Sequence, residues 1–517
     1  MDTSINLPMA LSQSAAQMTL ADFFEDQVAL QPQAIAIQTA QVNWTFAELD
    51  MKVNQLCNWL RLRGVVPGER IAILSENCPH YVQTLLAAAK LGAIVACLNW
   101  RQTSEELAHC IGLVKPKLAL ISDRYAHHTQ LFDQTEILMM GEVMESALAT
   151  SSTATPHRVV QPEDGLYILY TSGTTGNPKA ALISHRALLA RCTMAAIDGG
   201  FRRGATFVCW PPMFHMVSAD QVLMALAGGG KIVMLDGFQL DELCDAVEQE
   251  TNLGWFVLMP GMIDKVLEEL KRRGSEPQPM DSVGCMADLV PRHQIAEVTR
   301  LFNAPFRNSF GSTEAGPAPG GGRGGRIAVG LVPQDLGKSQ SSMTRVRLID
   351  EEGCDVAPGQ PGELLLRSAS LFSGYWGMPE ATSEAFEGGW FHTGDVFVRQ
   401  GDNTLQFVDR RKYLIKSGGE NIYPAEIEQL LLTSPRIVDA AVVRKSDPKW
   451  GEVPVAFVAT EDVSLTVADV IALCQGRIAG YKMPREVRFI RYQDMPRSTT
   501  GKVMRNQLED LLKKEAN

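Results

Sequence analysis

The sequence lacks the features that mark several broad classes of protein. Its ten cysteines are widely spread and include no CxxC pair, so neither a zinc site nor a disulfide framework is expected. No uninterrupted apolar run reaches the ~18 residues that span a membrane. The N-terminal stretch also lacks a basic start and a sustained apolar core. We therefore expect a cytoplasmic protein without a transmembrane segment.

Positive charge is also scarce. Lys and Arg total 48 against 59 Asp and Glu, and the net charge of −11 provides no global basic surface for nucleic acid. A nucleic-acid partner is therefore not expected, whereas a small anion held by a few placed residues is compatible with this charge. The 517 residues exceed the ~250 to 300 at which a single hydrophobic core usually stops growing, so several domains are expected.

Short apolar runs rich in β-branched residues alternate with amphipathic segments such as residues 45–63 and 81–91. This alternation predicts βαβ units around mostly parallel sheets, and hence an α/β fold for the large N-terminal part. The expected strands occupy residues 70–74, 92–98, 117–121, 167–170, 206–209, 231–235 and 254–259.

The pattern changes after residues 316–330, GPAPGGGRGGRIAVG, where we expect a mobile loop with no regular element. Beyond it, short alternating strands predict a small β-rich subdomain at about residues 331–409. A charged turn at 409–413 then leads into a final segment with its own mixed pattern. We therefore divide the chain into a core, 1–409, and a small mobile α+β C-terminal domain, 410–517. The strands of the β-rich subdomain are expected at 344–349, 362–367, 394–399 and 404–408.

The residues with the clearest chemistry follow the apolar strand at 167–170. The sequence continues as TSGTTGNPKA, in which glycines free the backbone, hydroxyls add donors and Lys179 adds positive charge. This combination suits the binding of phosphate oxygens, and a plain hairpin turn is the alternative. It is not a Walker A loop, because Pro178 stands between the second glycine and the lysine. The expected phosphate contacts are Thr171, Ser172, Gly173, Thr174, Thr175 and Gly176.

The segment TSGTTGNPK resembles the phosphate loop of the adenylate-forming superfamily, which comprises acyl-CoA synthetases, adenylation domains of peptide synthetases and luciferases. Further motifs similar to those of the superfamily follow in the expected order across nearly the whole chain. They are PPMFH at 211–215, FGSTE at 310–314, TGD at 393–395, DRRKYLIKSGGENIYPAEIE at 409–428 and PRSTTGKVMR at 496–505. The resemblance implies that ATP, Mg²⁺ and coenzyme A are used.

For the nucleotide, the resemblance implies that Glu314 ligates Mg²⁺, that Thr313 lies by the α-phosphate and that Phe310 packs against adenine. Asp395, accompanied by Arg410, would accept hydrogen bonds from the ribose hydroxyls. These roles provide counter-charge and a metal for pyrophosphate as the leaving group.

The segment CMADL at 285–289 departs from the GGAPL-like residues that are usual in the superfamily. The adenine side of the site is therefore less well defined by the resemblance than the phosphate side. Asp288, Ser309 and Gly311 complete the nucleotide site that we expect.

PPMFH is implied to border the acyl pocket, with His215 gating the entry of the carboxylate. Amino-acid adenylation domains usually carry an acidic residue near here. None occurs at 213–217, although Asp220 is close in sequence, so an amino-acid substrate is disfavoured but left open. The pocket is expected to be apolar, which favours an aromatic, alicyclic or medium-chain acid. Its expected lining is Trp210, Met213, Phe214, His215, Met259, Gly261, Met262, Gly311, Ala315 and Pro317.

In the C-terminal domain, Lys502 is implied to contact the carboxylate and the α-phosphate during adenylation. Lys412 falls at the superfamily's hinge, about which the domain would rotate between two half-reactions. The motif SGGENIYPAEIE is more similar to the CoA ligases than to carrier-protein users. Coenzyme A would contact Ser417, Gly418, Gly419, Trp450, Tyr481, Lys482 and Arg485.

These features predict an ATP-dependent acyl-CoA ligase that forms an acyl-AMP and then transfers the acyl group to coenzyme A. The alternatives are an enzyme that loads a carrier-protein thiol, a luciferase-like oxygenase, and a nucleotide-dependent scaffold on a decayed ligase fold. A decayed relative would be expected to lose Lys179, Glu314, Asp395 or Lys502, and all four are present. The sequence does not determine the oligomeric state, and a homodimer stays open.

Overall fold

The computed structural model describes residues 17–171, 177–321, 325–401, 404–418, 420–497 and 503–516. The chain forms two compact units, each assembled from segments that are far apart in sequence. The first comprises Met1–Gly254, Gly311–Ala318 and Ser368–Glu384, and the second comprises Trp255–Phe310, Pro319–Arg367 and Ala385–Asn517. Among the described helices, none has the length and apolar character to cross a membrane.

The main sheet of the first unit has the strand order β6-β5-β3-β4-β7-β8. All neighbouring pairs are parallel except β7 and β8, which are antiparallel. Its central strands read as continuous apolar runs, as expected for strands covered on both faces. The strands are β3 (Arg70–Leu74), β4 (Ile94–Cys97), β5 (Leu118–Ile121), β6 (Glu136–Met139), β7 (Gly165–Thr171) and β8 (Lys179–Ser184).

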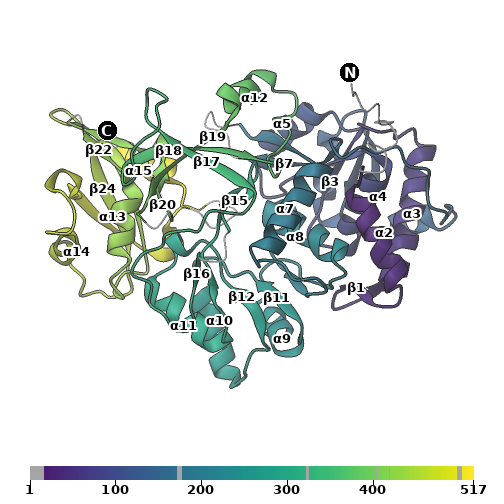
Figure 1. Cartoon of the computed structure of the whole chain (residues 1–517), viewed down its shortest axis with the longest axis horizontal. Coiled ribbons are helices and arrows are strands. Elements are labelled where there is room, and N and C mark those ends of the chain that lie inside the picture. Colours follow the sequence, from purple (N-terminus) through teal and green to yellow (C-terminus); the bar gives the residue numbers. More distant parts are fainter. Residues whose placement is uncertain are drawn as a thin grey trace, which may run out of the picture. The chain divides into compact units, whose positions relative to one another are not determined.

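A second sheet in this unit has the order β2-β1-β10-β9, with β1, β10 and β9 parallel. Figure 1 shows α2, α3 and α4, which pack against one another beside the main sheet. The strands are β1 (Ile35–Gln38), β2 (Asn43–Thr45), β9 (Phe207–Cys209) and β10 (Ile232–Met234). The helices are α2 (Leu20–Leu30), α3 (Phe46–Leu62), α4 (Pro79–Leu91), α5 (Ser104–Val114), η1 (Asp123–Leu131), α6 (Glu142–Leu148), α7 (His185–Ile197), α8 (Met216–Ala227), α9 (Leu240–Gln249) and α12 (Pro379–Ala385).

The helix starts of the first unit follow local capping rules. Thr45 precedes α3, where its hydroxyl accepts from the Glu48 amide at 3.2 Å and the Glu48 carboxylate accepts from the Thr45 amide at 2.8 Å. This reciprocal pair satisfies two amide donors that the first turn of a helix leaves unpaired. Thr103 and Glu106 repeat the arrangement at α5. Local sequence therefore determines where these two helices begin.

The second unit contains a sheet of order β11-β12-β13-β16 and an antiparallel sheet of order β17-β18-β19-β20. Its elements up to residue 413 are β11 (Leu253–Phe256), α10 (Ile263–Arg273), β12 (Met280–Val283), η2 (Ala287–Leu289), α11 (Arg292–Phe302), β13 (Phe306–Arg307), β16 (Arg326–Ile327), β17 (Thr344–Ile349), β18 (Pro361–Ser368), η4 (Glu387–Gly389), β19 (Phe391–Arg399), β20 (Leu405–Arg410) and η5 (Arg411–Tyr413). Between β13 and β16 in sequence, β14 (Phe310–Ser312) pairs with β15 (Gly316–Gly320) in a separate two-stranded sheet.

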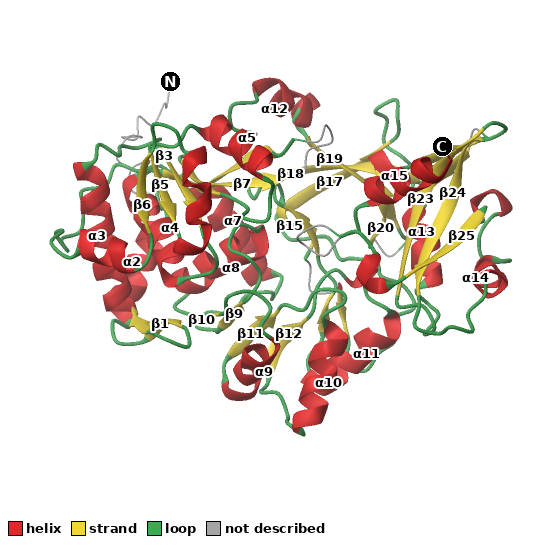
Figure 2. Cartoon of the chain, turned by 180° about the vertical axis from the view of Figure 1, so that it is seen from behind, coloured by secondary structure: helices red, strands yellow, loops and turns green. Residues whose placement is uncertain are grey.

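The C-terminal part of the second unit is built on a sheet of order β22-β21-β24-β23, with β25 parallel to β24. Alternate residues of β23 and β24 point to opposite faces and join two separate apolar clusters. One cluster includes α13 and α14, and the other includes α15; Figure 2 shows these elements. The elements are β21 (Ile415–Ser417), β22 (Glu420–Ile422), α13 (Pro424–Leu431), β23 (Asp439–Asp447), β24 (Gly451–Ala459), α14 (Val467–Cys474), η6 (Gly480–Lys482), β25 (Glu486–Ile490), η7 (Tyr492–Asp494) and α15 (Arg505–Ala516).

The predicted fold class, a mixed α/β chain with parallel-containing sheets and a C-terminal α+β part, is confirmed. The expected strand at 344–349 coincides with β17, and the helix expected at 45–63 is α3. One expectation is wrong: residues 316–330 contain β15 and β16. These strands form because β14 and β13 offer backbone partners, which outweighs the low strand propensity of glycine and proline. The domain boundary at 409–413 stays a prediction.

Candidate functional site

The phosphate-binding segment connects two antiparallel strands of the main sheet. Thr171 ends β7, Lys179 begins β8, and the two are register partners. The loop is thus a hairpin connection whose first and last residues lie opposite each other. Ser172, Gly173, Thr174, Thr175 and Gly176 lie outside the described residues.

Lys179 and Glu314 share an aromatic neighbour, Tyr375. The Lys179 ammonium lies 4.9 Å from the centroid of the Tyr375 ring, and the Tyr375 hydroxyl donates to Glu314 Oε1 at 3.0 Å. Burial, and then the neighbouring Glu314, raises the pKa of Tyr375 above its ordinary value, so the hydroxyl stays a donor at neutral pH. The fold thus joins a cation, a phenol and a carboxylate from residues 179, 314 and 375.

Sequence reasoning missed Tyr375. Its signal was modest, an aromatic residue between glycines in the segment SGYWG. The amide of Phe372, the residue just before this segment, donates to the Glu314 carbonyl at 2.8 Å, and the rings of Phe372 and Tyr375 lie 4.8 Å apart. Residues 372–375 therefore hold both the backbone and the side chain of Glu314.

Asp220 is buried and engaged by two partners. Arg191 Nη1 lies 3.0 Å from Asp220 Oδ2, and the Tyr167 hydroxyl donates to Oδ1. The Arg191 and Asp220 side chains are 0% and 6% exposed. Because the Asp220 carboxylate is already paired with Arg191 and Tyr167, it does not need a substrate amine as counter-charge, so Asp220 lends no support to an amino-acid substrate.

The turn at PPMFH is held by a buried residue that sequence reasoning also missed, Asn77. Its side-chain amide donates to the Pro211 carbonyl at 2.9 Å, and its Oδ1 accepts from the Met213 amide at 2.9 Å. The Ser218 hydroxyl also donates to the Pro211 carbonyl, at 2.6 Å. These bonds fix the backbone that leads into α8, for which His215 is the N-cap residue.

Aromatic rings gather around Phe214. Its ring lies 4.5 Å from His215 and 5.8 Å from Trp100, the latter edge-on, and Trp100 stacks on Tyr125 at 5.5 Å. Trp210, also predicted to line the pocket, contacts Phe238 at 5.6 Å. Sequence reasoning named Trp210, Phe214 and His215 but not the two rings contributed by residues 100 and 125.

The remaining residues that were predicted to line the acyl pocket lie on separate elements of the chain. In the first unit, Ala315 is buried and Pro317 is half-buried. In the second unit, Met259 Sδ lies 3.6 Å from the thiol sulfur of Cys285. Met262 is the N-cap residue of α10, and Gly261 lies just before it.

Asp395 and Arg410 are register partners on β19 and β20, with Arg410 Nε 3.0 Å from Asp395 Oδ1. Asp395 is almost fully buried, whereas the Arg410 side chain is 39% exposed. The ring of Phe310, which was predicted to pack against adenine, lies 5.0 Å from the rings of both Phe397 and Phe407. Of the predicted nucleotide-binding residues in this unit, Asp395 and Arg410 form an ion pair and Phe310 packs among aromatic rings.

The unusual CMADL segment contains a buried ion pair. Lys338 Nζ lies 2.5 Å from Asp288 Oδ2, with side chains 0% and 8% exposed. Lys338 also donates to Asn308 Oδ1 at 3.0 Å. Asp288 thus has its counter-charge from the protein, and Ser309, half-buried, follows Asn308 directly.

The predicted CoA residues are partly brought together. The Gly418 amide donates to the Trp450 carbonyl at 2.8 Å, and Gly418 has φ +60°. A Cβ at this glycine would lie 2.8 Å from the indole ring, so the close approach requires glycine. Trp450 is 39% exposed and Ser417 is buried.

Tyr481 is also exposed, on η6, and Lys482 is paired with Glu426 at 2.7 Å. The Arg485 amide donates to the Pro454 carbonyl at 2.8 Å. Lys412, on η5, lines a cavity of about 320 Å³ with Arg411, Lys416 and Arg444. Gly419 and Lys502 lie outside the described residues.

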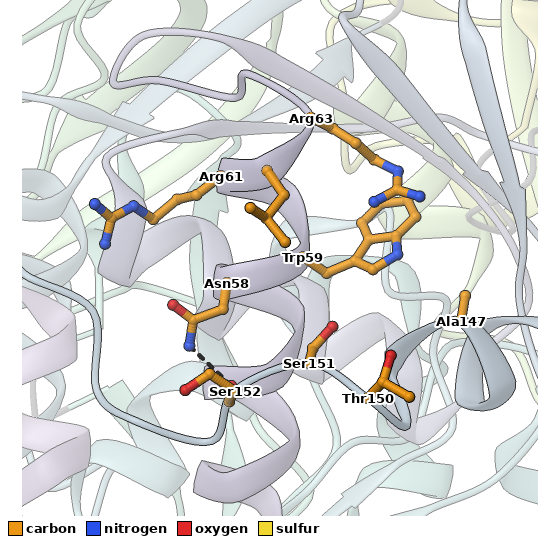
Figure 3. Close-up of a pocket in the computed structure, with 9 residues that line it drawn as sticks. Asn58, Trp59, Arg61, Arg63, Ala147, Thr150, Ser151 and Ser152 are labelled. Carbon is orange, nitrogen blue, oxygen red and sulfur yellow. Dashed lines mark hydrogen bonds between the residues drawn. The ribbon is translucent and has the colours of Figure 1, made fainter.

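A larger cavity of about 620 Å³ lies between the end of α3 and residues 147–152, and Figure 3 shows it. Asn58 donates to the Ser152 carbonyl at 2.8 Å, and the Arg63 guanidinium lies 3.4 Å from the Trp59 ring centroid. None of the motif residues lines this cavity, so its size does not make it the candidate site.

Comparison with known proteins matches residues 24–376 to the family model described as AMP-binding enzyme, and residues 426–502 to the AMP-binding enzyme C-terminal domain. The chain belongs to the AMP-binding enzyme family. It lies in the CoA-ligase branch of the adenylate-forming superfamily, as its motifs predicted. Its class is acid–thiol ligase, and the cosubstrates and metal of that class are ATP, coenzyme A and Mg²⁺.

Relatives of this AMP-binding enzyme are similar over nearly their whole length. The chain is 32% identical to an indoleacetate–CoA ligase of Aromatoleum aromaticum, covering 96% of this chain and 98% of the relative. It is 32% identical to a feruloyl-CoA synthase of Amycolatopsis sp., covering 93% and 96%. The fold matches a crystal structure of an anthranilate CoA ligase in complex with anthranoyl-AMP, with a TM-score of 0.86, 21% identity, and coverage of 97% and 98%.

Proposed function

We propose that this ligase activates an aromatic carboxylic acid as an acyl-AMP, with release of pyrophosphate, and then transfers the acyl group to coenzyme A with release of AMP. The observation that carries the substrate class is the cluster of aromatic rings around Phe214, which includes Trp100 and His215. Ring faces and edges provide directional contacts for another aromatic ring beyond simple burial. The similar indoleacetate, feruloyl and anthranilate ligases also support this class.

Alicyclic and medium-chain acids are the next candidates. Met213, Met259 and Met262 are adaptable side chains that fill irregular space without imposing a shape. They would tolerate a saturated substrate, but they offer it no directional contact. We therefore rank these acids below aromatic ones.

The residues around Glu314 fit Mg²⁺ and the phosphates of ATP. A carboxylate oxygen is a ligand type that Mg²⁺ uses, and Glu314 forms no ion pair with any described residue. When bound, Mg²⁺ neutralises charge that develops on the pyrophosphate leaving group. Tyr375 orients one oxygen of Glu314 and leaves the carboxylate its charge. Lys179, 4.9 Å from the same ring, would hold phosphate oxygens by charge.

The other proposed roles follow the chemistry of each side chain. Asp395 would accept from ribose hydroxyls, with Arg410 fixing one of its oxygens. Phe310, backed by two rings, would pack on adenine, and Thr313 would donate to the α-phosphate. Lys502 would contact the carboxylate and the α-phosphate through its ammonium group.

We also propose that the chain divides at residues 409–413 and that Lys412 is the hinge. Asp409, three residues before Lys412, is buried and accepts from the Ala425 amide at 2.8 Å, while Arg505 Nη1 lies 3.3 Å away. Both partners belong to the proposed C-terminal domain, so these contacts cross the hinge and would have to break when the domain rotates. Torsion at Lys412 would then carry the Gly418 turn and Trp450 between half-reactions.

A substrate panel tests the proposal. Phenylacetate, indole-3-acetate, ferulate, octanoate and acetate are supplied with ATP, Mg²⁺ and coenzyme A, and AMP and pyrophosphate are measured. We expect the highest kcat/KM with an aromatic acid. A preference for octanoate or acetate contradicts the substrate class, and transfer to a carrier-protein thiol but not to coenzyme A contradicts the acceptor.

Three variants sharpen this test. Phe214→Leu keeps an apolar side chain but removes the ring, so it is expected to lower kcat/KM for the aromatic acid more than for octanoate. Lys502→Ala is expected to abolish adenylate formation, and Lys412→Pro is expected to impair the thioester step. If both lysine variants behave as wild type, the assigned domain rotation is wrong.

A further inference from the structure

Arg191 is the largest fully buried side chain among the described residues. It lies on α7, and its ion pair with Asp220 joins α7 to α8, which lie side by side in Figure 1. The Tyr167 hydroxyl, on β7, donates to the second oxygen of Asp220. Asp220 therefore neutralises the charge of Arg191, and both oxygens of the Asp220 carboxylate have a partner. The other donors of the guanidinium are left for other groups.

Those remaining donors reach backbone carbonyls. Arg191 Nη2 donates to the Thr313 carbonyl at 2.9 Å, with a longer contact of 3.4 Å to the Glu314 carbonyl. Nε donates to the Ser370 carbonyl at 3.1 Å. The planar fork of arginine serves three directions at once, which an ammonium group on a flexible chain does not reproduce. The turn that carries Glu314 is thus hydrogen-bonded to a fixed, buried cation.

Gly316 makes room for this arrangement. It has φ +66°, and a Cβ at this position would lie 2.6 Å from Arg191 Nε and 2.7 Å from its Cδ and Cγ. Any larger residue would therefore displace the guanidinium. Glycine is required at position 316 because the Arg191 side chain packs against its backbone too closely for a Cβ atom.

Residues 372–375 hold the same turn, as described above. Glu314 thus has two supports, Arg191 on α7 and residues 372–375, and both reach its backbone carbonyl. Only residues 372–375 also reach the carboxylate, through the Tyr375 hydroxyl.

We propose that Arg191 is a positioning residue for adenylate formation, which holds the backbone of Thr313 and Glu314 so that their side chains are presented to the α-phosphate and to Mg²⁺. This inference rests on the proposed roles of Thr313 and Glu314. Because Asp220 lies on α8, which follows His215 directly, the same guanidinium also ties the Glu314 turn to the helix behind the proposed acyl pocket.

The test separates positioning from charge burial. Arg191→Met alone leaves the Asp220 carboxylate buried without a counter-ion, which destabilises the fold whether or not Arg191 positions Glu314. The double variant Arg191→Met/Asp220→Asn removes both charges and keeps an acceptor for Tyr167. Arg191→Lys keeps the ion pair but lacks the fork, and it provides a second folded variant.

Two readouts are used: KM and kcat for Mg-ATP in pyrophosphate release, and equilibrium binding of α,β-methylene-ATP with and without Mg²⁺. For the double variant and for Arg191→Lys, we expect KM to rise about ten- to hundredfold, with a matching loss of Mg²⁺-dependent analogue binding. Folding is checked by thermal denaturation. Wild-type KM and analogue binding in either folded variant overturn the inference.

Lys90→Met is the matched control. Lys90 is also a buried cation, 1% exposed, paired with Glu25 at 2.9 Å and Asp50 at 2.6 Å, and it has no proposed role in catalysis. We expect lower stability with KM for Mg-ATP within about twofold of wild type. A rise as large as that of the Arg191 variants would show a general effect of destabilisation and overturn the inference.

Glu314→Gln distinguishes the two levels of the proposal. If this variant keeps wild-type Mg²⁺ dependence, the proposed role of Glu314 fails and the positioning role fails with it. If Glu314→Gln is defective while the folded Arg191 variants are normal, the proposed function stands and only the positioning role is wrong.

Discussion

Two arginine–aspartate pairs of this protein have the same separation and different surroundings. In each, an arginine nitrogen lies 3.0 Å from a carboxylate oxygen, in Arg191–Asp220 and in Arg410–Asp395. The Arg191 side chain is 0% exposed and the Arg410 side chain is 39% exposed. Both aspartates are buried, so the pairs differ in the burial of the arginine, which makes Arg191 an internal support and leaves Arg410 partly in contact with water.

The reason lies in desolvation. A buried guanidinium must have its donors satisfied by the protein, and Arg191 meets this need with Asp220 and three backbone carbonyls. Arg410 keeps part of its side chain in water and bears a smaller desolvation cost. The following predictions test this contrast, from the largest expected effect to the smallest.

Arg191→Met is expected to lower the free energy of unfolding by about 3–5 kcal/mol, because it leaves an unpaired carboxylate in the interior. Urea denaturation followed by circular dichroism measures the change. A loss below about 1 kcal/mol would show that water or local rearrangement solvates Asp220, and the contrast between the two pairs would disappear.

Asp395→Ala is expected to raise KM for ATP about ten- to hundredfold, because a charged acceptor for the ribose hydroxyls is lost. Steady-state kinetics with ATP and with 2′-deoxy-ATP measures the effect. The variant should discriminate less between the two nucleotides than wild type does. Equal discrimination would contradict the ribose contact.

Tyr375→Phe is expected to lower kcat/KM for ATP about three- to tenfold, because one hydrogen bond to Glu314 is lost without a change of charge. The folded pKa of Tyr375 is raised, chiefly by burial, so its contribution to stability is complete below pH ~10 and is lost as pH rises beyond that. Between pH 8 and pH 11, the free energy of unfolding should fall less steeply with pH in the variant than in wild type. An identical slope in both proteins would contradict the assigned environment.

Arg410→Met is expected to lower the free energy of unfolding by about 1–2 kcal/mol, less than Arg191→Met, because the 39% exposed Arg410 bears little desolvation cost although its loss leaves the buried Asp395 without this partner. Thermal denaturation of this variant beside Arg191→Met gives the direct comparison. A loss comparable with that of Arg191→Met would show that exposure does not separate the two pairs.

Much of the fold was predictable because its signals are local. Apolar runs became β3, β4 and β5, and Thr45 with Glu48 began α3 where the pattern placed it. Residues 316–330 were mispredicted for the complementary reason. Glycine and proline are poor strand formers by themselves, but β15 and β16 form because strands from elsewhere supply hydrogen-bond partners.

The candidate site divides in the same way. The motif residues Lys179, Glu314 and Asp395 were named from the sequence because their neighbours in the chain form recognisable patterns. Tyr375 and Asn77 were not named, since each acts on a residue more than sixty positions away. No local pattern records such a contact.

The sequence by itself determined the family, the order of the motifs and the chemistry that each motif brings. Only the tertiary structure decided which polar groups meet: Asp220, near the acyl motif in sequence, is neutralised by Arg191, and Arg191 in turn holds the backbone beside Glu314. The physical reason is that residue type sets what a side chain is able to do, whereas burial and the partners within hydrogen-bond reach set what it does. Those depend on contacts between segments that the sequence keeps far apart.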